Sequence, residues 1–144
     1  MKKVMMIGPV GSGKSTLTKR LLSDSSPVTK TQALNYKEWI IDTPGEYSEN
    51  PMFYRSLMAT SFEARVLLVI QDATKDQQLL PPNFSQGFPL VPFGVITKID
   101  HPEANIKKAE QLLRQVLPNQ DIFQVSSITL EGIEELRSAI LKYL

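Results

Sequence analysis

Short apolar segments alternate with segments of helical periodicity along the chain. The segments that predict strands are 4–7, 39–41, 65–72, 93–100 and 121–127, with a further short strand at 33–36 pairing with the second of them. Segment 65–72 is apolar throughout its centre, as expected of a strand covered on both faces. Strands that alternate with helices in this way predict strand–helix–strand units around a mostly parallel sheet.

Helical periodicity lies between most of these strands. The predicted helices cover 14–22, 51–62, 102–117 and 130–144. Pro51 and Pro102 stand at the start of two of them, and proline suits a first helical turn. Residues 73–92 contain four prolines and little periodicity. We therefore expect a short helical turn and a loop there instead of a full crossover helix.

Composition excludes several classes of function. A chain of 144 residues with 42% hydrophobic and 22% charged residues suits one globular domain over 1–144. The formal net charge is +1 and no run of Lys or Arg is long, so no nucleic-acid partner is expected. The chain has no cysteine and a single histidine, His101, which excludes disulfides and disfavours zinc sites.

The apolar segments are too short for a membrane. None approaches the roughly 18–20 residues of a membrane span. The run after Lys3 breaks at Gly8 and Pro9, before it reaches the core of about 7–15 residues that a secretion signal needs. We expect a cytoplasmic protein without a membrane span.

The segment GPVGSGKS, residues 8–15, fits the phosphate-loop pattern G-x-x-x-x-G-K-[ST] and lies between a strand and a helix. Glycines allow backbone N–H groups to surround phosphates, and the helix N-terminus adds partial positive charge. Lys14 is expected to reach the β- and γ-phosphates, and the Ser15 hydroxyl to bind Mg²⁺. The predicted nucleotide-binding residues here are Val10, Gly11, Ser12, Gly13, Lys14, Ser15 and Thr16.

The segment DTPGE, residues 42–46, follows the next buried strand. Asp42 is a candidate Mg²⁺ ligand through a water molecule, and the Gly45 N–H is a candidate donor to the γ-phosphate. Thr31, with Thr29 as the alternative, is the candidate in the preceding loop to complete the Mg²⁺ coordination when the γ-phosphate is present.

Two later segments predict a choice of guanine. TKID, residues 97–100, matches [NT]-K-x-D, in which Asp100 would accept hydrogen bonds from the guanine ring N–H and amino group. Thr97 stands where asparagine is commoner, and the stem of Lys98 would lie along the base. In VSSITLEG, Ser126 or Ser127 would place a backbone N–H against the guanine oxygen, although a serine-rich helix start capped by Thr129 explains that segment almost as well.

These motifs, in this order, resemble the Ras-like GTPases, and KTQALNYKEWIIDTPGEY preceded by GPVGSGKS resembles the EutP/PduV family of ethanolamine and propanediol utilisation. The resemblance implies an α/β, single-domain P-loop NTPase fold. The pattern of strands and helices adds to this a mostly parallel sheet of five or six strands with a shortened third crossover helix. The resemblance also implies Mg²⁺ and GTP or ATP as ligands. A role beside bacterial microcompartments follows from it, with shell or enzyme proteins as partners.

Two residues predict slow GTP hydrolysis. Glu46 stands where many GTPases carry a glutamine that orients the attacking water, and a carboxylate about 4 Å from a γ-phosphate is repelled by about 4 kcal/mol at an effective dielectric of about 20. It is expected to swing outward or to bind protonated. The branched side chain of Val10 narrows the space beside the γ-phosphate. The catalytic candidates are Lys14, Glu46 and Thr31.

Two other functions stay open. The family resemblance also implies an acetate kinase, which would transfer the γ-phosphoryl of ATP to acetate. Acetate is an anion, so it would need a cation besides Lys14, for which Lys30 and Arg55 are candidates, and an ionised Glu46 would repel it. The third hypothesis is a non-catalytic assembly module that keeps the nucleotide site for stability.

Overall fold

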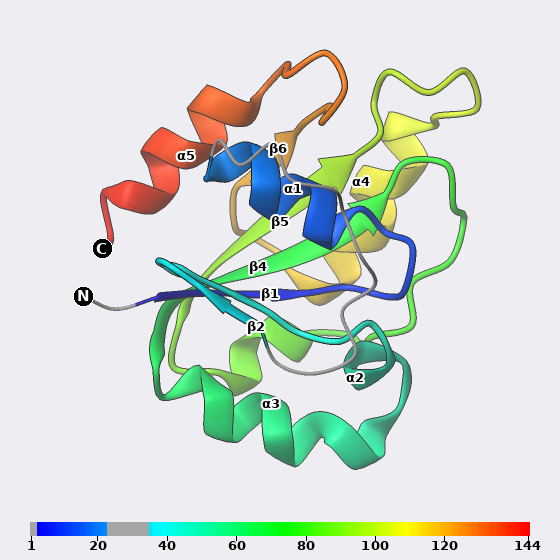
Figure 1. Cartoon of the computed structure of the whole chain (residues 1–144). Coiled ribbons are helices and arrows are strands. Elements are labelled where there is room, and N and C mark those ends of the chain that lie inside the picture. Colours follow the sequence, from blue (N-terminus) through cyan, green and yellow to red (C-terminus); the bar gives the residue numbers. More distant parts are fainter. Residues whose placement is uncertain (1–2, 23–34) are drawn as a thin grey trace.

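Strand β1 (Lys3–Ile7) lies inside the sheet, and its apolar residues are buried on both faces. The computed structural model describes residues 3–22 and 35–144 and places β1 in a six-stranded sheet of order β2-β3-β1-β4-β5-β6 (Figure 1). The other strands are β2 (Asn35–Lys37), β3 (Ile40–Asp42), β4 (Ala64–Asp72), β5 (Val91–Thr97) and β6 (Ile122–Gln124). All neighbours pair in parallel except β2, which pairs antiparallel with β3. The predicted mostly parallel sheet is confirmed.

Helices cover both faces of the sheet. One face carries α1 (Lys14–Leu21) and α5 (Ile133–Leu141), and the other carries α3 (Tyr54–Ser61) and α4 (Ile106–Val116) (Figure 1). A hydrophobic core lies on each face of the sheet, and alternate residues of β1 pack into one core or the other. Val4 and Met6 pack with residues of α1 and α5, whereas Met5 and Ile7 pack with residues of α3 and α4. This alternation is the period of a strand that is covered on both sides.

Several element boundaries differ from the predicted ones. Helix α4 begins at Ile106 and not at Pro102, because the side chain of Asn105 caps it by accepting from the N–H of Lys108 at 3.1 Å. Helix α5 begins only at Ile133, after Gly132 in the left-handed conformation. Strand β5 ends at Thr97, because Lys98 turns to a φ of +62°.

The predicted helix at 51–62 is two elements. A 3₁₀ turn, η1 (Pro51–Phe53), leads into α3, and a short helix, α2 (Glu46–Glu49), that the sequence did not predict precedes it. The rings of Tyr47 and Phe53 stack with centroids 4.7 Å apart and so join α2 to η1.

The connection from β4 to β5 contains no α-helix, as predicted. Its regular element is a 3₁₀ turn, η2 (Phe84–Gly87). This segment is fixed to the end of α4 by two hydrogen bonds, from the Asn83 N–H to the Gln115 carbonyl at 2.7 Å and from Ser85 Oγ to the Val116 carbonyl at 2.8 Å. The shortened crossover leaves the region behind the phosphate loop without a helix.

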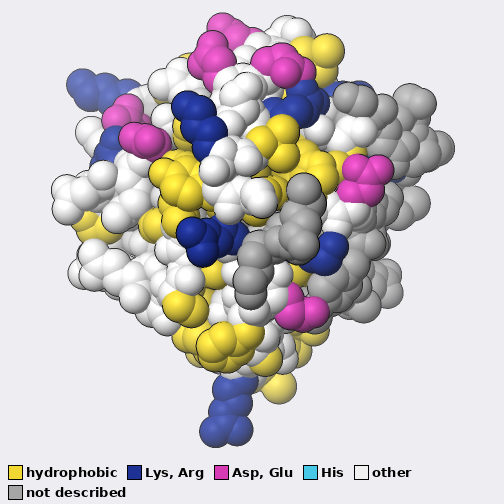
Figure 2. Space-filling view, turned by 90° about the vertical axis from the view of Figure 1, so that its left-hand side faces the viewer, with side chains coloured by type: hydrophobic (Ala, Val, Ile, Leu, Met, Phe, Trp, Pro, Cys, Tyr) yellow, Lys and Arg dark blue, Asp and Glu magenta, His cyan; other side chains and the backbone are white. Residues whose placement is uncertain are grey.

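The two ends of the sheet differ in character. Figure 2 shows the end where the parallel strands begin, and hydrophobic side chains gather at the centre of this face with Lys, Arg, Asp and Glu around them. The sequence motifs follow the opposite, carboxyl ends of the strands. Within residues 3–22 and 35–144, no helix is long and apolar enough to cross a membrane.

Candidate functional site

The predicted site residues come from the carboxyl ends of neighbouring strands. The phosphate loop follows β1, Asp42 ends β3, Asp72 ends β4 and Thr97 ends β5. The order β3-β1-β4-β5 makes these strands neighbours. Since ligands of open α/β sheets bind at the carboxyl ends of the strands, the fold brings the motifs to the position where a ligand is expected.

The phosphate loop wraps between β1 and α1 with two glycines in the left-handed conformation, Gly11 at a φ of +79° and Gly13 at +98°. Gly13 is the residue before the first turn of α1, where Lys14 begins the helix. A residue with a β-carbon is strained at such angles, so the pattern of glycines matches the backbone that the loop adopts. Thr16 lies half-buried in the first turn of α1.

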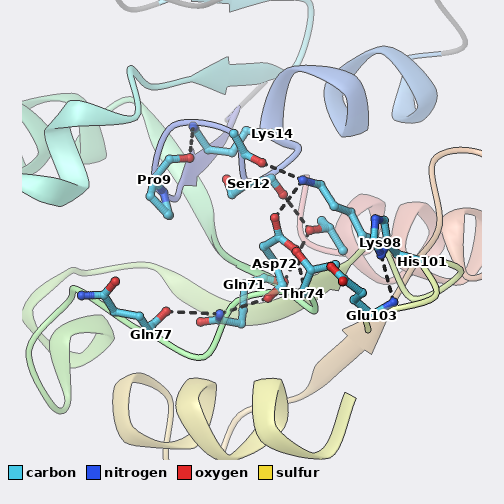
Figure 3. Close-up of polar contacts among 12 residues, drawn as sticks. Pro9, Ser12, Lys14, Gln71, Asp72, Thr74, Gln77, Lys98, His101 and Glu103 are labelled. Carbon is cyan, nitrogen blue, oxygen red and sulfur yellow. Dashed lines mark hydrogen bonds and ion pairs between the residues drawn. The ribbon is translucent and has the colours of Figure 1, made fainter. Parts of the chain in front are cut away.

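Lys14 is buried beside the loop. Its ammonium lies 3.5 Å from the Pro9 carbonyl, a long contact (Figure 3). Burial lowers the pKa of Lys14, and the carboxylates of Asp42, Glu49 and Glu46 act in the opposite direction. The charges of described residues that act on this lysine are therefore negative, and a bound polyphosphate would add to them.

The two predicted metal ligands lie together. Ser15 Oγ donates to Asp42 Oδ2 at 2.7 Å, and Asp42 is buried at the end of β3. Hydroxyl and carboxylate oxygens are the ligands that Mg²⁺ prefers, and Mg²⁺ commonly takes few protein ligands besides phosphates. The Ser15 and Asp42 oxygens are thus of the kind that hold Mg²⁺ together with phosphate oxygens. Among the described residues no three His, Cys, Asp or Glu side chains form a metal-binding group.

Gly45 lies directly against the phosphate loop. A β-carbon on Gly45 would lie 2.3 Å from the Val10 nitrogen and 2.5 Å from Val10 Cγ2. Only glycine fits there, which explains the glycine of DTPG by close approach and not by its φ of −58°. Glu46 follows as the first residue of α2, half-buried and near enough to raise the pKa of Lys14.

Thr97 and Lys98 bind the phosphate loop from the side of β5. Thr97 Oγ1 donates to the Ser12 carbonyl at 2.6 Å, and Lys98 Nζ donates to the Gly11 carbonyl at 2.8 Å. Figure 3 shows Ser12 and Lys98 of this group. Thr97 thus makes a hydrogen bond to the phosphate loop through its hydroxyl, although it lacks the side-chain amide of the asparagine that is commoner at this position. The TKID segment and the phosphate loop therefore form one hydrogen-bonded unit.

Asp100 is held by the next predicted segment. Its Oδ1 accepts from Ser126 Oγ at 2.7 Å, and the same hydroxyl oxygen accepts from the N–H groups of Ile128 and Thr129. The Ser126 N–H donates to the Glu131 carbonyl at 3.0 Å, so of the two predicted donors to a guanine oxygen the Ser127 N–H stays the candidate. Ser127 is tied to α1 by its carbonyl, which accepts from Arg20 Nε at 2.9 Å.

The alternative explanation of this segment, a helix start capped by Thr129, is wrong. Residue Gly132 precedes α5, with no side-chain cap, and the hydroxyl of Thr129 accepts from the Glu131 N–H at 3.3 Å.

Asp72 is a site residue that the sequence reasoning missed. Its Oδ2 lies 2.8 Å from Lys98 Nζ, and its Oδ1 accepts from the N–H and the hydroxyl of Thr74 (Figure 3). These partners outweigh its burial and lower the pKa of the carboxyl. The available signal was the end of the apolar strand, where Gln71 and Asp72 follow a continuous run of apolar residues.

Thr31, with Thr29 and Lys30, lies outside the described residues. Arg55 is exposed on α3.

The family model of PduV–EutP, described as ethanolamine utilisation – propanediol utilisation, matches residues 1–142. The chain belongs to this family. It is 31% identical over 138 residues to a Salmonella typhimurium protein named "Probable acetate kinase EutP", covering 94% of this chain and 87% of the relative. It is 32% identical over 137 residues to the "Propanediol utilization protein PduV" of Citrobacter freundii, covering 94% of this chain and 91% of that relative.

A solved structure shares the fold. The Roco2 RocCORdC protein of Methanosarcina barkeri bound to GDP superposes with a TM-score of 0.64 at 20% identity. The match covers 98% of this chain and 48% of that one, so the present chain corresponds to about half of the Roco protein. This likeness shows the fold of the PduV–EutP member, a P-loop α/β fold.

Proposed function

We propose that this chain binds guanine nucleotides with Mg²⁺ and hydrolyses GTP slowly, as a nucleotide-dependent component of ethanolamine or propanediol utilisation. The observation that carries the proposal is the Asp100 carboxylate, fixed by Ser126 at 2.7 Å beside a Thr97–Lys98 pair that is bonded to the phosphate loop. The family supplies the metabolic setting.

The base would be chosen by Asp100. Its carboxylate offers two acceptor oxygens, which suit the ring N–H and amino group of guanine. Adenine lacks this pair of donors, and a mismatched polar group that is removed from water costs a few kcal/mol. Ser126 holds the carboxylate in place, and the Lys98 stem would lie beside the base.

The phosphates would lie over the loop formed by Val10 to Lys14. The Lys14 ammonium would balance their charge, and the oxygens of Ser15 and Asp42 would hold the Mg²⁺, Asp42 through a water molecule, with Thr31 as a further proposed ligand. The metal would neutralise charge on the phosphate oxygens when bound.

Slow hydrolysis follows from the surroundings of Val10. Gly45 packs on its backbone and Cγ2, so the space beside the third loop position is occupied by protein atoms. Glu46 cannot donate to phosphoryl oxygens while ionised, and as a carboxylate near Lys14 it weakens the positive field there. We expect a single-turnover rate below about 1 s⁻¹ without a partner protein.

The choice of base is tested by Asp100→Asn. An asparagine offers one acceptor and one donor, which suit the ring N–H and the carbonyl at position 2 of xanthine. The variant is expected to lose GTP affinity and to gain affinity for xanthosine triphosphate. Unchanged GTP affinity would refute a base-reading role for Asp100. The exposed Asp121→Asn is the matched control and should bind like the wild type.

A second candidate function is acetate kinase, which the name of the Salmonella relative favours. The charges described around Lys14, from Asp42, Glu46 and Glu49, work against a bound acetate anion. Formation of acetyl phosphate from ATP and acetate, lost in Lys14→Ala, would establish this function over the first. Binding of neither GTP nor ATP would leave the non-catalytic assembly module.

The remaining parts of the proposal concern the place of action. We place the chain in the cytoplasm beside a bacterial microcompartment, with shell or enzyme proteins as partners. Co-sedimentation of the tagged chain with purified compartments tests this placement.

A further inference from the structure

A cavity of about 250 Å³ lies behind the phosphate loop, on the side reached by the connection from β4 to β5. Its walls are formed by Pro9 to Ser12 of the phosphate loop, Ile70 to Asp72 at the end of β4, residues 75–79 and Glu49 of α2. The space exists because this crossover contains no α-helix. In Figure 3 it lies between Pro9 and Ser12 on one side and Gln71 and Gln77 on the other.

The floor of the cavity is fixed by an amide network. Gln71 is buried, and its Nε2 donates to the Asp72 and Gln77 carbonyls at 3.2 and 3.4 Å. The Nε2 of Gln78 donates to Gln71 Oε1 at 2.8 Å, and its Oε1 accepts from the Leu80 N–H at 3.1 Å. These hydrogen bonds fix residues 71–80 in a conformation that leaves a space between them and the phosphate loop. The cavity is therefore held open by specific bonds.

One polar group in the wall has no partner. Ser12 is 1% exposed, and its Oγ makes no hydrogen bond within the described part of the chain. A β-carbon on Gly8 would lie 3.0 Å from this oxygen and 2.9 Å from Ile70 Cβ, which locates the hydroxyl beside a residue of the cavity wall. A buried hydroxyl without a partner costs about 1–3 kcal/mol, so a ligand that bonds with it gains that difference.

The exposed carboxylates of the cavity wall disfavour the binding of an anion. Glu49 and Asp76 are exposed carboxylates of the wall, and Lys75 is the one cationic residue among the described residues that line it. Asp72, the third carboxylate, is paired with Lys98. A molecule that carries a positive charge at one end and a hydroxyl at the other matches carboxylates at the rim and Ser12 within.

We propose that this cavity is a second binding site, distinct from the nucleotide site, for a small cationic alcohol such as an amino alcohol. The cavity exceeds the roughly 30 Å³ share of one water molecule several times over, so a compound of a few heavy atoms fits. Its walls include the outer side of the phosphate loop and Glu49 of α2, so an occupant contacts the segments that would respond to phosphate.

The test is a titration of the ¹⁵N-labelled full chain with 2-aminoethanol, without nucleotide, followed by amide chemical shifts. Propane-1,2-diol and acetate are titrated at the same ionic strength. The proposal expects saturable shifts of the Ser12 and Gln78 amides with 2-aminoethanol, weaker binding of the diol and none of acetate. No saturable shift at these amides, or acetate or the diol binding as well as 2-aminoethanol, overturns it.

Variants separate the contributions of charge and hydroxyl. The pair Glu49→Gln with Asp76→Asn changes exposed residues and is expected to weaken 2-aminoethanol about tenfold, the loss of a charge-assisted contact. The control for this pair of substitutions is Glu135→Gln on α5. The Ser12→Ala variant is expected to weaken the binding of 2-aminoethanol severalfold, and its control is Ser56→Ala on α3. Equal losses in variant and control contradict the site. Because no nucleotide is present, the result is independent of the proposed GTPase function.

Discussion

Gly45 packs against Val10 more closely than any side chain would allow. The Gly45→Ala variant places a methyl group 2.3 Å from the Val10 nitrogen, a backbone atom that cannot move aside cheaply. We predict a loss of about 1–3 kcal/mol in the free energy of unfolding, the usual cost of overpacking, measured by urea denaturation.

Gly87→Ala is the matched control for this prediction. No atom lies within 4 Å of a β-carbon at Gly87 and its φ is not positive, so the variant should be neutral or slightly more stable. Similar stability of the two variants would show that the contact between Gly45 and Val10 does not exist.

The lowered pKa of Lys14 gives a second prediction, on pH. Phosphate binding favours the protonated ammonium and so raises its pKa again, which means that binding takes up a proton at alkaline pH. The affinity for GTP is therefore expected to fall as the pH rises through the pKa of Lys14 in the free protein, at lower pH than for an ordinary lysine.

Lys14→Arg is the comparison, because arginine keeps its charge over the same range. The affinities of the wild type and of Lys14→Arg for GTP are measured by fluorescence of a labelled nucleotide. The guanine ring also loses a proton at alkaline pH, but this affects both proteins alike and cancels in the ratio of their affinities. A ratio that does not change with pH would contradict the assigned role of Lys14.

At the scale of elements, the ends of β4 and β5 act together on the phosphate loop. Asp72 of β4 fixes Lys98, which bonds to the Gly11 carbonyl. We predict that Asp72→Asn lowers the free energy of unfolding by about 1–2 kcal/mol at neutral pH. Since the pKa of Asp72 is lowered in the folded chain, its contribution is present above the ordinary pKa of an aspartate and is lost as the pH falls through the lowered value.

Urea denaturation of wild type and Asp72→Asn from neutral to acidic pH measures this. The difference between them should shrink toward low pH, and a difference that stays constant would contradict the ionic part of the prediction.

The sequence predicted strands better than helix ends. Continuous apolar runs such as that of β4 were sufficient, because both faces of the sheet are covered. The starts of α4 and α5 were misplaced because they depend on local bonds. The Asn105 side chain caps one, and the left-handed Gly132 precedes the other. Proline at 102 was a weaker signal than the cap three residues later.

At the scale of the whole molecule, the sequence predicted which motifs would meet but not how they are joined. Phosphate loop, DTPG and TKID lie at one edge because the strands before them are parallel neighbours. The bonds from Thr97 to Ser12, from Lys98 to Asp72 and from Ser126 to Asp100 connect residues far apart in the chain. No local pattern specifies such partners.

Because these bonds connect the motifs to one another, we predict that nucleotide and Mg²⁺ bound at the site raise the unfolding temperature of the whole chain. Thermal unfolding followed by circular dichroism is expected to shift upward with GDP and Mg²⁺ by more than with either alone, since a ligand bound only to the folded state stabilises it. Removing the metal with EDTA should reverse most of the shift. In the Ser15→Ala variant, the unfolding temperatures measured with GDP in Mg²⁺ and in EDTA should differ less than in the wild type. A difference as large as that of the wild type would exclude Ser15 as a metal ligand.

Titration calorimetry of the chain with GTP and with ATP, each with Mg²⁺, tests the central claim most directly. The account predicts that GTP binds at least about 100-fold more tightly than ATP and that Lys14→Ala abolishes the heat. ATP binding as tight as GTP, or no heat with either nucleotide, would contradict it.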